Sequence, residues 1–168
     1  MIKKYQESSS IVYWIIGLIT VAVFGLIIFL AFKGSILPKS NKTNREVALT
    51  CTTDMATQFH IHPHLEIYVN GQKQEIPANI GIVFNCMHPI HTHDTSGIIH
   101  VESPEQRDFT LADFFAVWDK TYNKNQVIDY KTDANHIIKE TVNDSEVWDF
   151  ENTVLRDKDK IVINYQVK

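Results

Sequence analysis

Residues 59–71 read FHIHPHLEIYVNG, and this stretch decides the fold. Apolar and polar side chains alternate along it, which is typical of a strand that buries one face. Pro63 cannot donate a hydrogen bond to a neighbouring strand, so it indicates an edge strand or a bulge. Asn70-Gly71 predicts a tight hairpin turn. The apolar positions of this strand are Phe59, Ile61, Leu65, Ile67 and Val69.

Further β-prone segments follow this hairpin. Residues 74–84 predict a returning segment that is interrupted at Pro77, and residues 98–102 predict another short strand after Gly97. Three later runs, separated by turns rich in Asn and Asp, have the same character: 127–130, 136–142 and 161–167. The sequence therefore predicts a mostly antiparallel sheet.

One amphipathic helix is predicted over residues 111–122. Thr110 and Asp113 have the spacing of a capping box, with Asp in the role usually taken by Glu or Gln. An apolar stripe at helical spacing is typical of a helix that packs on a core; its members are Leu111, Phe114, Phe115, Trp118 and Tyr122. The predicted class is thus α+β, one small domain with one main helix.

The N-terminal part contains a long apolar run. Residues 11–32 carry no charge, and as a helix they extend roughly 33 Å, enough to cross a bilayer core of about 30 Å. The run is too long for a cleavable signal peptide, and no small-x-small cleavage site follows it. We predict a basic tail over residues 1–10, a transmembrane anchor over 11–32, a polar linker over 33–50 and a folded domain over 51–168.

The basic residues give two indications of orientation. A literal count favours a cytoplasmic domain, because four basic residues follow the run: Lys33, Lys39, Lys42 and Arg45. A short basic tail directly before a long span is instead typical of a signal anchor. We expect a single-pass protein of the cell membrane with a cytoplasmic N-terminus and an extracytoplasmic domain, and the opposite orientation stays open.

The two cysteines, Cys51 and Cys86, depend on that orientation. In an oxidising compartment they could form a disulfide worth roughly 2–4 kcal/mol. In the cytosol they would stay reduced, or one would serve as a metal ligand. The formal net charge of −4 over 168 residues is small, so nothing indicates nucleic acid as a partner.

Histidines are concentrated in one region, since seven of the eight lie between His60 and His100. Residues two apart on a strand share a face, and imidazoles that converge can bind one ion at about 2.0–2.1 Å. We predict a metal site formed by His60, His62, His91 and His93, with His64, His100, Glu102 and Cys86 as alternates. His88 and His136 are expected to be ordinary surface residues.

Asp94 has two possible roles. It could accept a hydrogen bond from a ligand imidazole, as metal-bound histidines usually require, or it could be a turn residue. The expected ion is copper or zinc, although imidazole also suits iron and nickel. A blue-copper site is disfavoured because no methionine follows Met87.

Several segments resemble a widespread prokaryotic family of membrane-anchored or secreted domains. The likeness lies in HIHPHLEIYVNGQKQEIPANIGI, PIHTHDTSGIIHVESP, FTLADFFAVWDKTYN and LRDKDKIVINY, and its most specific part is the HTHD-x-SG-x-IHVES motif at residues 91–103. The resemblance implies an extracytoplasmic setting. It implies no activity and no particular metal.

These observations lead to three hypotheses. The first is a membrane-anchored domain that binds copper or zinc and serves in metal handling or as an accessory protein, with the bilayer as partner through residues 11–32. The second is a structural or partner-binding subunit of a membrane complex. The third is a zinc-dependent hydrolase with an open water position. Binding is favoured over catalysis, because the sequence has no nucleophile elbow, P-loop or HExxH motif.

Overall fold

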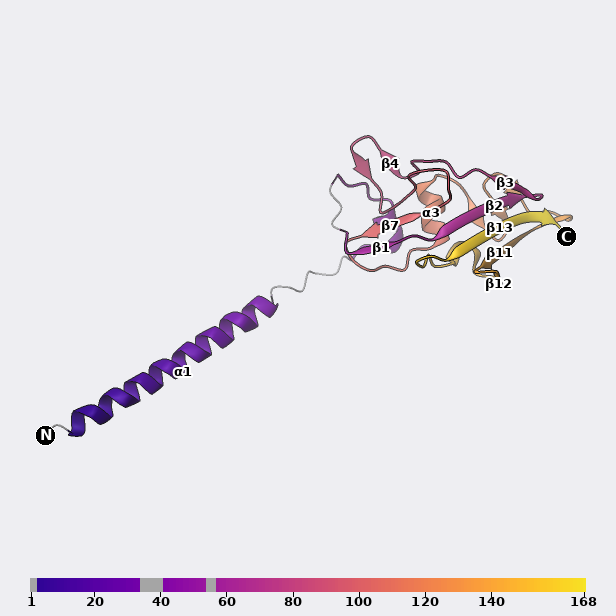
Figure 1. Ribbon diagram of the computed structural model, residues 1–168. Coiled ribbons are helices and arrows are strands. Elements are labelled where there is room, and N and C mark those ends of the chain that lie inside the picture. The colour runs from indigo at the N-terminus through magenta and orange to yellow at the C-terminus, as the bar shows by residue number, and fades with distance from the viewer. Residues whose placement is uncertain (1–2, 34–40, 54–56) are drawn as a thin grey trace. The chain divides into compact units, whose positions relative to one another are not determined.

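A computed structural model describes residues 3–33, 41–53 and 57–168. The chain divides into two units, Met1–Asn41 and Lys42–Lys168 (Figure 1). The first contains one apolar helix and the second a set of mostly antiparallel sheets with few helices. The predicted α+β class is confirmed.

Helix α1, Lys3–Lys33, forms the first unit. Within it, Ile11–Phe29 is long and apolar enough to cross a membrane, and none of this segment is buried. A signal sequence would meet the same criteria of length and composition. The helix begins at Lys3, so residues 3–10 of the predicted tail continue the same helix.

Helix α2, Asn44–Ala48, begins the second unit. Thr43 caps it, because the Thr43 N–H donates to Glu46 Oε2 at 2.7 Å and the Glu46 N–H donates back to the Thr43 hydroxyl at 3.2 Å. Ala48 is fully buried. The last part of the stretch predicted as a linker is therefore folded onto the domain, while residues 34–40 lie outside the described residues.

The largest sheet has the strand order β12-β11-β13-β2-β3. All its pairs are antiparallel except β13 with β2. Leu65 and Ile67 on β2 lie opposite Ile161 and Ile163 on β13, and all four side chains are buried. The bounds are β2 His64–Val69, β3 Gln72–Gln74, β11 His136–Val142, β12 Ser145–Val147 and β13 Lys160–Val167.

A second sheet carries three of the histidines, His60, His91 and His100. Its order is β1-β7-β6, with β1 Phe59–Ile61, β6 Ile90–His91 and β7 His100–Ser103. The prediction of a single strand over residues 59–69 is wrong, because this stretch forms two strands, β1 and β2, that belong to different sheets. The chain leaves one sheet and joins the other at His62-Pro63, where proline provides no N–H for a ladder.

Short strands complete the domain. They are β4 Ile82–Val83, β5 Cys86–Met87, β8 Tyr122–Asn123, β9 Gln126–Val127 and β10 Tyr130–Lys131, and a 3₁₀ helix, η1, covers Phe150–Asn152. At the β2–β3 hairpin, Asn70 and Gly71 both have positive φ, at 49° and 80°. Those angles are the ones a type I′ turn requires.

Helix α3 spans Leu111–Val117, with Leu111, Phe114 and Phe115 buried. It ends five residues before the predicted end at Tyr122. Asp119 adopts a left-handed conformation at φ 57°, and the Lys120 N–H donates to the Phe115 carbonyl at 2.9 Å. This is a Schellman-type ending. Tyr122 instead begins β8, and its ring stacks on Phe115 with centroids 4.9 Å apart.

A carboxyl group is buried inside the domain. Glu140 on β11 is 1% exposed and accepts hydrogen bonds from the hydroxyls of Tyr122 and Thr153. Burial raises the pKa of Glu140.

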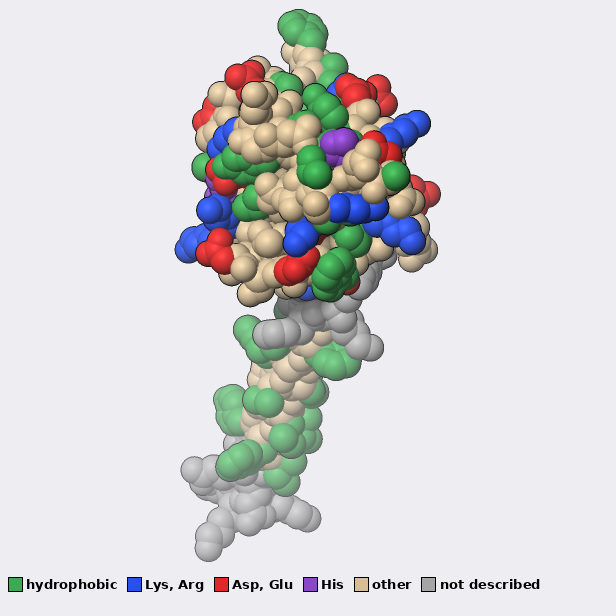
Figure 2. Space-filling model, turned by 90° about the vertical axis from the view of Figure 1, so that its right-hand side faces the viewer, with side chains coloured by type: hydrophobic (Ala, Val, Ile, Leu, Met, Phe, Trp, Pro, Cys, Tyr) green, Lys and Arg blue, Asp and Glu red, His purple; other side chains and the backbone are tan. Residues whose placement is uncertain are grey.

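On the face of the domain shown in Figure 2, acidic and basic side chains are interspersed, so this face offers no single-sign surface for nucleic acid.

Candidate metal centre

Three strands bring the histidines together. β7 is the central strand of its sheet, so His100 lies between residues from β1 on one side and β6 on the other. His91 is directly opposite His100, and His60 is opposite Glu102. His62 directly follows β1, and His93 lies two residues after the end of β6. Five imidazoles therefore form one cluster.

Two sets of three histidines in this cluster have the spacing of a metal site. His91, His93 and His100 form one set, called here the inner trio; His60, His62 and His100 form the other, called the outer trio. In each trio the three potential ligand atoms lie within 4.8 Å of one another. His100 belongs to both.

The inner trio contains an imidazole with a fixed tautomer. The Nδ1 of His91 lies 3.0 Å from the carbonyl oxygen of His88. A carbonyl only accepts hydrogen bonds, so Nδ1 carries the proton and Nε2 of the neutral ring carries the lone pair. A backbone carbonyl is a usual partner for a metal-bound histidine. His91 thus has the tautomer in which Nε2 could bind an ion.

The two neighbouring nitrogens have a spacing suited to one ion. Nε2 of His91 lies 3.2 Å from Nε2 of His93. Two nitrogens on a tetrahedral zinc, each at about 2.0–2.1 Å, are roughly 3.3 Å apart. Without metal, the same distance fits a hydrogen bond from His93 to His91.

Burial and neighbouring histidines favour the neutral form of two rings of the inner trio, His91 and His100. Burial lowers the pKa of His91 to about 4, against a smaller upward effect of the His88 carbonyl. Burial also lowers the pKa of His100, and the neighbouring His93 and His62 lower it further. Near pH 7 both rings are neutral, so a metal ion does not have to displace a proton from them.

The outer trio is more exposed and has acidic neighbours. The His60 and His62 side chains are 43% and 42% exposed, whereas His91 is fully buried. Nε2 of His60 lies 3.1 Å from Oε1 of Glu102, and Nδ1 of His62 lies 4.0 Å from Oδ1 of Asp157. Each of these rings thus has a carboxylate beside one of its nitrogens.

The four predicted ligands do not form one set among the described residues. Each predicted pair, His60 with His62 and His91 with His93, is instead completed by His100. His100 was predicted only as an alternate. The alternate Glu102 lies beside His60 and belongs to neither trio.

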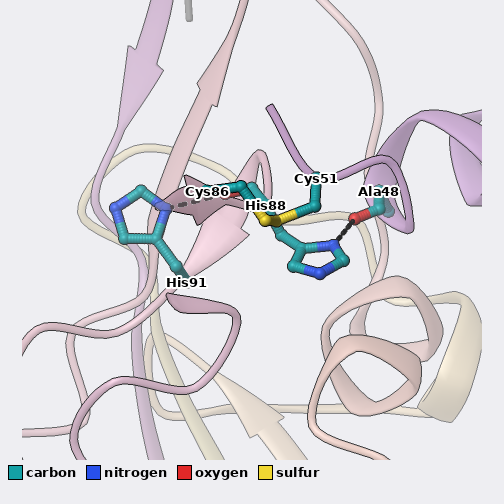
Figure 3. The surroundings of a disulfide bond; sticks show 5 residues. All are labelled: Ala48, Cys51, Cys86, His88 and His91. Atoms are coloured by element: carbon teal, nitrogen blue, oxygen red, sulfur yellow. Dashed lines mark hydrogen bonds between the residues drawn. A yellow bond between two sulfur atoms is a disulfide. The ribbon is translucent and has the colours of Figure 1, made fainter. Parts of the chain in front are cut away.

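The other candidates have different partners. His64 contacts the carbonyl oxygen of Ser96 through Nε2 at 2.9 Å, and Asp94 accepts the Ser96 N–H at 2.8 Å as a turn residue does. Cys86 is joined to Cys51 in a disulfide (Figure 3). Its sulfur is therefore not available as a thiolate ligand.

His88 and His136, expected at the surface, both have partners. The Nδ1 of His88 lies 3.0 Å from the Ala48 carbonyl oxygen (Figure 3), and the Nδ1 of His136 lies 3.0 Å from Asp133. His88 also supports the site, because its backbone carbonyl fixes the His91 ring. A backbone contact of this kind leaves no signal in the sequence.

Gly97 allows the loop after β6 to approach β2. Its φ is +91°, and a Cβ at this position would lie 2.3 Å from the carbonyl oxygen of Leu65. The Leu65 N–H donates to the Gly97 carbonyl at 2.9 Å. Only glycine permits both the backbone angle and the contact, so Gly97 holds the loop between His93 and His100 against the core.

The described structure is thus an apolar N-terminal helix and an α+β domain with a candidate metal centre of clustered histidines. No protein-family model, curated protein or solved structure matches this chain. Function is therefore argued from the geometry of the histidines.

Proposed function

We propose that this protein is a membrane-anchored metal-binding domain that holds a copper or zinc ion on His91, His93 and His100. Its role is metal handling, or service as an accessory protein at the membrane. The observation that carries the proposal is the pair of Nε2 atoms of His91 and His93, 3.2 Å apart, with the His91 tautomer fixed by the His88 carbonyl.

The donor set favours borderline divalent ions. Three imidazoles suit zinc and copper(II), whereas copper(I) prefers soft thiolate or thioether ligands. Both cysteines are in the disulfide, and the described residues include no free cysteine. Zinc and copper(II) are therefore the ions to test first.

The disulfide also supports the proposed location. Structural disulfides persist in oxidising compartments and are rare in the cytosol. We therefore propose that the domain lies outside the cytoplasm, with α1 as a signal anchor whose N-terminus is cytoplasmic.

The test is metal analysis of the full chain in detergent micelles. After loading with zinc or copper(II) and desalting, elemental analysis is expected to find one ion for each chain. His93→Ala should weaken binding by about 10–100-fold or more, since loss of a supporting contact alone has that effect. His93 is exposed, so this variant should stay folded.

His136→Ala is the matched control, because His136 belongs to neither trio. It should bind metal as the parent does. If the parent binds neither ion, or if His93→Ala and His91→Ala both bind it with the affinity of the parent, the proposed site on His91, His93 and His100 is wrong. A partner-binding subunit would then be the better hypothesis.

A further inference from the structure

The two trios share one ligand and differ in exposure. The His100 ring centroid lies 4.5 Å from that of His93 and 4.7 Å from that of His62. His100 is therefore in contact with one ring of each neighbouring pair. The cluster is continuous from the exposed His60 to the buried His91.

A neutral His100 ring cannot bind two ions at once. His100 is one of the three candidate ligands in each trio, and a neutral imidazole has one nitrogen lone pair to donate. An ion in the outer trio therefore withdraws His100 from the inner trio. The two positions are alternatives for a single ion.

The surroundings of the two positions suit different steps. The outer trio has exposed rings, and the carboxylates of Glu102 and Asp157 lie next to His60 and His62. Negative charge at an exposed site raises the local concentration of cations and their rate of association. The inner trio has a fully buried ligand, which water and competing chelators reach less easily.

We propose that the outer trio of His60, His62 and His100 is an exchange position for a divalent zinc or copper ion, which reaches the inner trio while staying bound to His100. The inference rests on the proposed metal-binding function. In the transfer, bonds from the ion to His60 and His62 are replaced by bonds to His91 and His93. The ion keeps its charge, so the step needs no oxidant or reductant.

The test compares ion exchange in the full chain in detergent micelles, with zinc as the probe. One variant is the double substitution His60→Ala and His62→Ala, which leaves the inner trio complete. Its equilibrium affinity for zinc should stay close to that of the parent. Its rates of zinc uptake and of release to a chromogenic chelator should fall about tenfold, the effect of raising the barrier by about 1.4 kcal/mol.

The second variant, His93→Ala, leaves the outer trio complete. It should still bind one zinc ion, more weakly than the parent, and release it to the chelator faster. His100→Ala removes a ligand from both trios and should bind most weakly. His136→Ala serves as the control and should match the parent in affinity and rates.

Three results would overturn the exchange position. They are unchanged rates in the double variant, loss of binding in the double variant with circular dichroism still native, or two zinc ions bound at once by the parent. In each of these cases the parent still binds zinc, so the metal-binding function survives. If the parent binds no zinc and no copper, the proposed function itself fails.

Discussion

Breaking the disulfide should destabilise the domain and weaken the metal site together. Cys51 and Cys86 are 35 residues apart in the sequence. For a loop of this length, the chain-entropy relation gives about 4 kcal/mol of stabilisation at 25 °C. Domains of ordinary stability unfold with about 5–15 kcal/mol, so the bond accounts for a large share.

The assay is urea unfolding of the full chain in detergent micelles, followed by near-ultraviolet circular dichroism. The free energy of unfolding should fall by about 2–4 kcal/mol in reductant, and by a similar amount in the double variant Cys51→Ser and Cys86→Ser. Reductant should have no further effect on the double variant. A loss below about 1 kcal/mol would refute the loop-entropy reasoning.

The same bond is linked to His91 through His88. Cys86 lies two residues before His88, whose ring contacts the Ala48 carbonyl and whose own carbonyl fixes the His91 ring (Figure 3). Reduction should therefore lower zinc affinity by about 10–100-fold, the usual effect of losing a supporting contact. Competition with a chelator measures the zinc affinity of the oxidised and the reduced protein. Equal affinity in both would show that His88 stays in place without the disulfide.

Four further predictions concern the core and the buried His91 ring. Phe115→Ala should cost about 3–5 kcal/mol of unfolding free energy because the Phe115 side chain is 1% exposed. A loss below about 1 kcal/mol in urea unfolding would contradict the burial of this ring in the core. Glu140→Leu leaves the buried Tyr122 and Thr153 hydroxyls without their acceptor and should cost about 2 kcal/mol or more. Burial raises the pKa of Glu140, so its contribution to stability is present below about pH 4.3 and is lost as pH rises through the folded pKa. The free energy of unfolding should therefore depend less on pH in Glu140→Gln than in the parent. The same pH dependence in both proteins would contradict this. The pKa of His91, about 4, lies below the unfolded value of about 6.5. The contribution of His91 to stability is therefore present above about pH 6.5 and is lost toward pH 4. At pH 5.5, nitrogen-15 NMR of the metal-free protein should show a neutral His91 ring protonated at Nδ1, and an imidazolium at that pH would contradict the account.

Much of the fold could be predicted from local patterns. The alternation in residues 59–69, the Asn70-Gly71 turn and the start of α3 at Leu111 all depend on neighbours in the sequence. The end of α3 was missed because Asp119, not glycine, adopts the left-handed conformation. The division between β1 and β2 was missed because Pro63 indicates only an interruption and does not say that two sheets meet there.

The site was predictable only in part for a similar reason. The two-residue spacing identified the pairs His60 with His62 and His91 with His93. The role of His100 depends on the strand order β1-β7-β6, which is set by pairing between distant segments. The contact of Asp157 with His62 depends on the return of the chain 95 residues later, and no local pattern encodes it.

X-ray absorption spectroscopy of the zinc-loaded full chain tests the central claim most directly. The spectrum should show a first shell of nitrogen or oxygen at about 2.0–2.1 Å with the outer scattering of three imidazoles, and His100→Ala should remove one of them. A shell with sulfur at about 2.3 Å, or a parent spectrum without imidazole scattering, would contradict a metal site on His91, His93 and His100.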